Sequence, residues 1–186
     1  MNAKDFSISD FSSHIIFITG GTKSGKSEFA EHLAKKVKNL AYVALSEKNI
    51  DDKDWLDKIK LHRKRRPKDW KLIETSDLLT ILRKEGGPLL IDSIGGFVME
   101  SIEKKYKDWL KRMNSLIVLL NKRKSITIIV GEQVGWSLVS EYKIGNTFIE
   151  RIGELQKKIT KISKDNWLAI NGRAIKIDEI SLEIPT

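Results

Sequence analysis

Cysteine is absent from this 186-residue chain, which excludes disulfides, thiolate metal sites and cysteine nucleophiles. The chain also lacks any apolar run near the roughly 20 residues that a membrane-spanning helix needs. Its first residues, Met1–Asp5, do not show the charged-then-apolar order of a signal peptide. We therefore expect a cytoplasmic protein with no stable membrane insertion.

The sequence has no internal repeat, low-complexity tract or clear linker, so one domain is the simplest organisation. Residues 1–13 lack a periodic pattern and are expected to be a flexible extension before a single domain over 14–186. The net charge of +9, from 34 basic and 25 acidic residues, permits binding to nucleic acid or to a membrane surface. It suits an enzyme with polyanionic substrates equally well, and a lysine-rich habit of the genome explains part of it.

The most informative stretch has the pattern G-x-x-x-x-G-K-S of a phosphate-binding loop. It consists of Gly20, Gly21, Thr22, Lys23, Ser24, Gly25, Lys26 and Ser27. A β-branched run, Ile15–Thr19, precedes the loop and a helical pattern follows it, so the motif has the context that it requires. Glycine lets backbone N–H groups converge on phosphate oxygens, and the helix N-terminus adds its own. Lys26 can reach the β/γ oxygens and Ser27 can ligate Mg²⁺, which predicts a nucleoside triphosphate site.

Hydrophobic periodicity predicts strands that alternate with helices, which is typical of an α/β fold with a mostly parallel sheet. Strands are expected at 15–19, 40–46, 70–75, 88–92 and 126–130, and a closing hairpin at 167–171 and 174–177. Helices are expected at 25–38, 51–65, 77–85 and 146–164, with one or two more over 97–124. The apolar stripe of the helical region 97–124, which includes Trp109 and Met113, is assigned to the core. Gly131–Gly135 is expected to be a polar turn after a strand.

Two strand ends carry candidate ligands, because the carboxyl ends of parallel strands form the ligand edge of such a sheet. The first strand end delivers Ala44, Leu45 and Ser46 to this edge. The second is Asp92, which follows four residues of a buried strand in the form of the second magnesium-side element of phosphate-loop enzymes. An ordinary strand-end aspartate is the alternative.

His62 stands in a strongly basic segment that includes Arg63, Lys64, Arg65 and Arg66. Such a run is usually a solvated helix end, and a lone histidine is more often structural than catalytic. Nearby cations disfavour protonation of the imidazole, however, and a neutral imidazole can be a nucleophile. The same cations would offset phosphate charge during attack at phosphorus. His14 and His32 are not set among phosphate-binding groups.

Together these motifs resemble the adenosylcobinamide kinase / adenosylcobinamide-phosphate guanylyltransferase family of cobalamin biosynthesis. The resemblance extends from about Ile15 to Ile177, and its most specific part is the His-x-x-x-Arg-Pro-x-x-Trp arrangement that begins at His62. Its further matches are Tyr42–Ser46, Glu74, Leu90–Asp92, Glu132–Gly135 and the Phe148–Gly153 helix.

The resemblance implies a three-layer α/β domain of the RecA-like phosphate-loop type, often trimeric, that uses GTP, ATP and Mg²⁺. Members phosphorylate adenosylcobinamide and then transfer GMP to the new phosphate through a guanylyl-histidine. His62 matches that histidine, with Lys26 and Asp92 as further catalytic residues and Ser27 and Asp92 on the metal. The nucleotide-binding positions of the family fall on Gly20–Ser27, Ala44–Ser46, Arg63–Arg66, Glu74 and Asp92.

Several residues depart from the family pattern. Leu45 stands where a threonine is usual, Asp92 replaces a frequent glutamate, and Gly131–Gly135 replaces a typical Thr-Asn-Glu-Val-Gly. We expect a corrinoid substrate, no nucleic-acid partner and a homo-oligomer. Two other readings stay open: another phosphate-loop kinase or a nucleic-acid-dependent ATPase, and a GTP-binding module that has lost catalysis.

Overall fold

A seven-stranded sheet forms the centre of the protein in a computed structural model, which describes residues 14–45, 67, 69–136 and 140–185. The strand order is β3-β2-β4-β5-β1-β6-β7, and every neighbouring pair is parallel except β6 and β7. The strands are β1 (Ile15–Gly20), β2 (Ala41–Leu45), β3 (Lys71–Thr75), β4 (Leu89–Asp92), β5 (Thr127–Glu132), β6 (Asp165–Ile170) and β7 (Arg173–Lys176). The mostly parallel sheet and the C-terminal hairpin are therefore confirmed.

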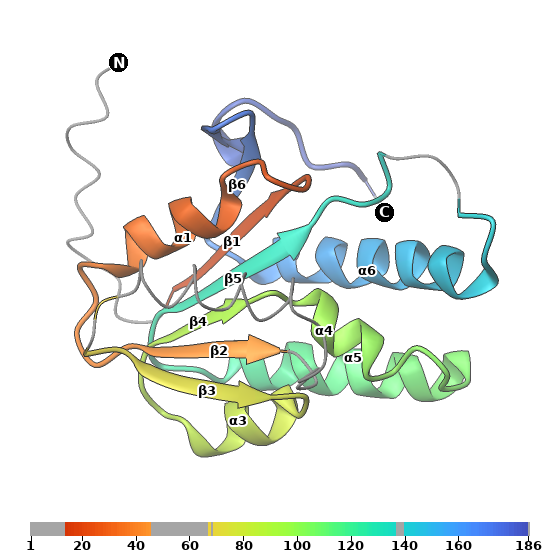
Figure 1. Cartoon of the computed structure of the whole chain (residues 1–186), viewed down its shortest axis with the longest axis horizontal. Coiled ribbons are helices and arrows are strands. Elements are labelled where there is room, and N and C mark those ends of the chain that lie inside the picture. The colour runs from red at the N-terminus through yellow and green to blue at the C-terminus, as the bar shows by residue number, and fades with distance from the viewer. Residues whose placement is uncertain (1–13, 46–66, 68, 137–139, 186) are drawn as a thin grey trace, which may run out of the picture.

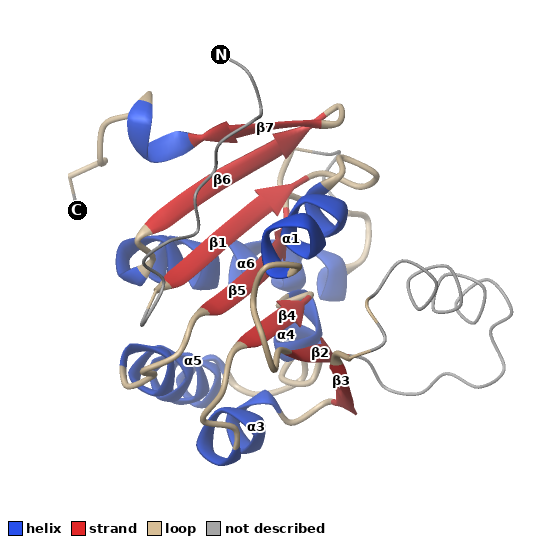
Figure 2. Cartoon of the chain, turned by 90° about the vertical axis from the view of Figure 1, so that its left-hand side faces the viewer, coloured by secondary structure: helices blue, strands red, loops and turns tan. Residues whose placement is uncertain are grey.

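The described helices cover both faces of this sheet, which gives three layers (Figures 1 and 2). They are α1 (Lys26–Ala34), α3 (Leu78–Lys84), α4 (Gly95–Met99), α5 (Tyr106–Asn121) and α6 (Lys143–Ile162), with a short 3₁₀ helix at Ile177–Glu179. Buried side chains of α1 pack on one face, while those of α3, α4, α5 and α6 pack on the other. None of these described helices has the length and hydrophobicity that crossing a bilayer requires.

The sheet has a hydrophobic core on each face, and successive side chains of β1 point alternately into one and the other. Ile15 and Phe17 join the core under α5 and α6, whereas Ile16 and Ile18 join the core under α1. Such period-two alternation, with apolar side chains on both faces, is what a strand covered by helices on both sides requires. Trp109 and Met113 of α5 are fully buried in the first of these cores, as predicted.

The boundaries of several elements differ from the predicted ones. The apolar region 97–124, predicted as one or two helices, forms two, α4 and α5, and α4 begins two residues earlier, at Gly95. The helix predicted at 25–38 ends at Ala34, and α6 begins at Lys143. Glu132 belongs to β5, so the expected turn at Gly131–Gly135 starts inside a strand. The helix predicted at 51–65 and the extension 1–13 lie outside the described residues.

Candidate nucleotide-binding site

The phosphate-binding loop connects β1 to α1 at the carboxyl edge of the sheet. Gly25 has φ +93° and ends the loop at the N-cap of α1, in the left-handed region that glycine adopts without strain. A Cβ at Gly20 would lie 2.4 Å from the carbonyl oxygen of Ala169 and 2.6 Å from Ser24 Oγ. Both glycines of the motif are therefore required by the fold of the loop as well as by a phosphate.

Lys26 and Ser27 are the first two residues of α1, so the loop and the helix dipole act at the same place. The Lys26 ammonium donates a hydrogen bond to the carbonyl oxygen of Gly21 at 3.0 Å. This bond folds the lysine back over the loop, on the side where the pattern predicts the phosphates. A triphosphate offers the same ammonium stronger acceptors than a neutral carbonyl.

Asp92 lies opposite the loop, at the end of β4. Its Oδ1 accepts a hydrogen bond from Ser27 Oγ at 3.2 Å, and its Oδ2 accepts one from the Tyr42 hydroxyl at 2.5 Å. Ser27 and Asp92, which the sequence predicts as metal ligands, are therefore in direct contact, and their role at a metal stays a prediction. The Asp92 carboxylate thus links three elements by hydrogen bonds: its own strand β4, α1 through Ser27 and β2 through Tyr42.

This pair of oxygen donors fits a magnesium ion. Mg²⁺ is usually bound by one or two protein oxygens and completes its shell with water and substrate phosphates. Within the described part of the chain, no cluster of three or more His, Cys, Asp or Glu side chains could form a complete metal cage. Two protein oxygens of this kind suit a cation whose remaining ligands are water and nucleotide phosphates.

Glu132 is a second carboxylate at this edge, and the sequence reasoning did not select it. Its Oε2 accepts a hydrogen bond from the backbone N–H of Gly95 at 3.1 Å, and its Oε1 accepts one from the Ser93 hydroxyl. A Cβ at Gly95 would lie 2.7 Å from this carboxylate, so a larger residue there would push the Glu132 side chain aside. The strand-end argument applied to Asp92 would have found Glu132 too, had β5 been extended by two residues.

Burial raises the pKa of Glu132, and the nearby charge of Asp92 acts in the same direction. The hydrogen bond from Ser93 and the positive charge of Lys26 oppose this increase. Glu132 thus shares an electrostatic environment with Lys26 and Asp92, although it lies on β5, beside the strand that ends at Asp92, whereas Lys26 lies on α1. Carboxyl groups with perturbed pKa values in such positions are typical of functional sites.

The other predicted nucleotide positions are only partly described. Ala44 and Leu45 end β2 at the carboxyl edge, and Glu74 lies on β3 in register with Ala44. A Cβ at Gly96 would come within 2.1 Å of the Leu45 carbonyl oxygen, so the turn after Asp92 packs closely against this strand end. Ser46, His62 and Arg63–Arg66 lie outside the described residues, and their roles stay predictions.

The fold and site define an α/β protein that binds nucleoside triphosphates through a phosphate-binding loop. Two solved structures agree with this fold. An ATPase from the type III secretion system of pathogenic bacteria has a TM-score of 0.56 at 13% identity, covering 88% of this chain and 58% of that chain. Protein PH0250 from Pyrococcus horikoshii OT3 has a TM-score of 0.55 at 7% identity, covering 95% and 94%.

Residues 16–177 match the model of one family, described as cobinamide kinase / cobinamide phosphate guanyltransferase, and the chain belongs to this CobU family. The bifunctional adenosylcobalamin biosynthesis protein CobU of Escherichia coli (strain K12) is 24% identical over 181 residues, covering 88% of this chain and 99% of that protein. The protein of the same name from Salmonella typhimurium (strain LT2) is 25% identical with the same coverage. The family suspected from the motifs is thereby confirmed.

Proposed function

We propose that the chain catalyses both reactions of its family: phosphorylation of adenosylcobinamide, and transfer of GMP from GTP to the resulting adenosylcobinamide phosphate. The family match supports the two activities. The structural observation that best supports the proposal is the contact between Ser27 of the phosphate-binding loop and Asp92 of β4. It joins the loop to Asp92, the strand-end acid for which the family resemblance implies a role at the metal.

In the proposed nucleotide complex, backbone N–H groups of Gly20–Ser27 surround the phosphates and Lys26 moves from the Gly21 carbonyl to the β/γ oxygens. Ser27 and Asp92 would hold Mg²⁺, which offsets phosphate charge when bound. Phosphoryl transfer depends mainly on such positioning and electrostatics. The corrinoid hydroxyl then attacks the γ-phosphorus and displaces the nucleoside diphosphate, and its proton passes to the Asp92 carboxylate or to water.

In the guanylyl step, a neutral nitrogen of His62 attacks the α-phosphorus of GTP, and pyrophosphate leaves as the nitrogen–phosphorus bond forms. The phosphate of adenosylcobinamide phosphate then attacks the same phosphorus and displaces the imidazole, which yields adenosylcobinamide-GDP and free His62. Arg63–Arg66 would offset the charge that develops at phosphorus. Because the two reactions need different atoms in line, we expect the segment around His62 to change position between them.

Labelling with GTP that carries the label on its α-phosphate tests the second step. The parent chain should form an acid-labile protein adduct, which adenosylcobinamide phosphate discharges, whereas His62→Asn should form none. His32→Asn is the matched control, because His32 is an exposed histidine on α1 and should leave labelling intact. An adduct that persists in His62→Asn would refute the assignment.

The same preparation separates the two alternative readings. A phosphate-loop ATPase acting on nucleic acid would show nucleic-acid-stimulated hydrolysis with steep salt dependence and no covalent nucleotide. A module without catalysis would bind GTP without turnover or label. Lys26→Ala should impair both proposed activities, since each uses the same bound triphosphate.

We also propose that the chain is a homo-oligomer, and a trimer is the form that the family resemblance implies. Exposed apolar side chains support an association surface, since Ile180, Leu182 and Ile184 are 73%, 93% and 81% exposed. Light scattering coupled to size-exclusion chromatography should give a mass of three chains. A monomer at micromolar concentration would contradict the proposal.

A further inference from the structure

The carboxylate of Asp92 is held at both oxygens, and only one of its two partners belongs to the phosphate-binding loop. Ser27 Oγ contacts Oδ1, while the Tyr42 hydroxyl donates a shorter hydrogen bond, 2.5 Å long, to Oδ2. We propose that Tyr42 is a positioning residue: it fixes the Asp92 carboxylate so that Oδ1 faces Ser27, with which Asp92 would hold the magnesium ion of a bound nucleotide. This inference rests on the proposed function for the role of Asp92.

Tyr42 can hold that position because its own ring is fixed. The residue lies in β2, in register with Leu90 of β4, and its side chain is 2% exposed. Its ring stacks on Trp70, with 6.3 Å between ring centroids and 21° between planes. A stacked, buried ring on a central strand leaves the phenol oxygen little freedom, so the hydroxyl supplies a fixed donor.

A fixed donor matters because an aspartate carboxylate turns readily about its last torsion, which is broad rather than three-fold. Without a partner on Oδ2, the two oxygens of Asp92 would exchange places, and Ser27 alone would have to orient the group. Partners that orient a metal ligand from behind typically change metal affinity or activity by about 10- to 100-fold. Tyr42 occupies such a place, although it would not touch the metal.

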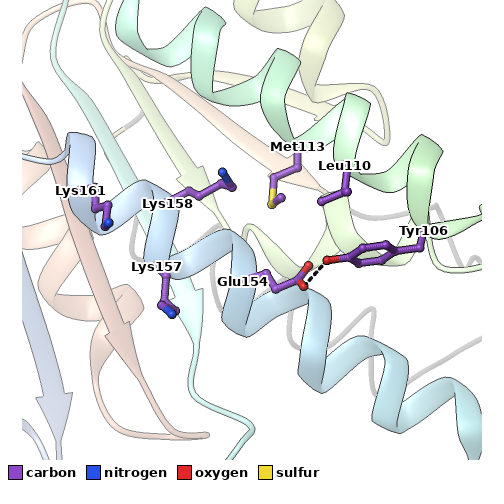
Figure 3. Close-up of a pocket in the computed structure, with 7 residues that line it drawn as sticks. All are labelled: Tyr106, Leu110, Met113, Glu154, Lys157, Lys158 and Lys161. Atoms are coloured by element: carbon purple, nitrogen blue, oxygen red, sulfur yellow. Dashed lines mark hydrogen bonds between the residues drawn. The ribbon is translucent and has the colours of Figure 1, made fainter. Parts of the chain in front are cut away.

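Tyr42→Phe tests this role, since it removes the hydroxyl and keeps the ring that packs on Trp70. A matched control lies on the opposite side of the sheet, where the Tyr106 hydroxyl donates to Glu154 Oε1 at 2.6 Å (Figure 3). Glu154 also has a second donor, Trp109 Nε1, at 3.0 Å from Oε2. Tyr106→Phe therefore removes the same kind of bond from a carboxylate that keeps one other partner, far from the loop in sequence.

The measurement is binding of a fluorescent GTP analogue, first in EDTA and then over a magnesium titration. Tyr42→Phe should need about tenfold more Mg²⁺ for the half-maximal gain in affinity, while its affinity in EDTA stays unchanged. Tyr106→Phe should match the parent chain in both conditions. Asp92→Asn sets the reference for complete loss of this ligand, and Tyr42→Phe should add nothing in the Asp92→Asn background.

Three results would overturn the inference: an unchanged magnesium requirement, an equal loss of affinity with and without magnesium, or an effect that persists in the Asp92→Asn background. The second result would mean that Tyr42 supports the strand rather than the carboxylate. Failure of the proposed function is distinguishable, because it would appear as a parent chain that binds GTP with magnesium but neither phosphorylates a corrinoid nor labels His62.

Discussion

A methyl group added at Gly96 would lie 2.1 Å from the carbonyl oxygen of Leu45 and 2.6 Å from the Leu45 Cβ. Carbon and oxygen atoms in contact ordinarily stay about 3.3 Å or more apart. The substitution Gly96→Ala therefore forces the start of α4 away from the end of β2 by about an ångström. Both elements flank the site, since α4 follows Asp92 and β2 ends at the predicted nucleotide positions.

Overpacking of this kind destabilises a fold by about 1–3 kcal/mol. Gly153 supplies the matched control, because it lies within α6 and a Cβ there would meet nothing within 4 Å. Gly153→Ala should stabilise the fold by about 0.5–1 kcal/mol through the better helix propensity of alanine. For a chain of this length, 1 kcal/mol corresponds to about 2–4 °C in Tm.

Urea denaturation of the parent and both variants measures the difference, and the same preparations are titrated with GTP and magnesium. Gly96→Ala should lose stability and bind the nucleotide more weakly, while Gly153→Ala should gain stability and bind it normally. If Gly96→Ala were as stable as Gly153→Ala, the turn after Asp92 would not be packed against β2, and the reasoning would fail.

Three further substitutions test separate features. Burial raises the pKa of Glu132, so the stability that this carboxyl contributes is complete below the ordinary glutamate pKa and is lost as pH rises through the folded-state pKa. Over that pH window, Glu132→Gln should therefore gain stability relative to the parent chain, as measured by urea denaturation. Asp77→Ala removes the N-cap of α3, whose side chain accepts from Thr80 N–H, and should cost about 1 kcal/mol in the same assay. Arg151→Met should lower the stability by about 3–5 kcal/mol, because the buried guanidinium donates to three carbonyl oxygens between α4 and α5, and exposed Arg83→Met is its control.

Each of these has a contradicting outcome. A Glu132→Gln difference that is flat with pH would mean that the carboxyl titrates alike in the folded and unfolded chain. Loss of stability in Asp77→Ala that does not lessen toward low pH would contradict the hydrogen bond from Thr80, which lowers the pKa of Asp77. Equal thermal stability of the Arg151 and Arg83 variants would show that the three carbonyls find other donors.

Hydrophobic periodicity predicted the strands well where their side chains are buried in apolar core. β1 and β5 are covered on both faces, so their apolar runs marked them directly. The predicted boundaries were wrong at the ends of helices and strands, because backbone hydrogen bonds determine where an element stops. Glu132 is polar and looked like a turn, yet it pairs in register with Gly20 on β1, so the strand continues through it. The predicted helical region began at residue 97 and so missed Gly95 and Gly96, which open α4; at Gly96 the close approach of the Leu45 carbonyl requires glycine.

The site was predictable to the extent that its chemistry follows from local patterns. The phosphate-binding loop is contiguous, and Asp92 ends a strand, so both could be located from neighbours in the sequence. The Tyr42 hydroxyl could not be located in this way, because its hydrogen bond to Asp92 spans 50 residues. It also depends on the register of β2 with β4, which places both side chains on the same face of the sheet. Its neighbours along the chain suggest only a buried aromatic residue.

The two carboxyl groups at this edge differ in ways that suit a triphosphate. Asp92 receives hydrogen bonds from Ser27 and Tyr42, and the first of these donors belongs to the phosphate-binding loop. Glu132 has its donors in the turn that follows Asp92, and burial favours its neutral form. Two fully ionised acids beside a triphosphate would repel it, so the raised pKa of Glu132 lessens the repulsion at this edge of the sheet. Glu132 then acts mainly through the shape of the turn after Asp92, and its hydrogen bonds matter more than its charge.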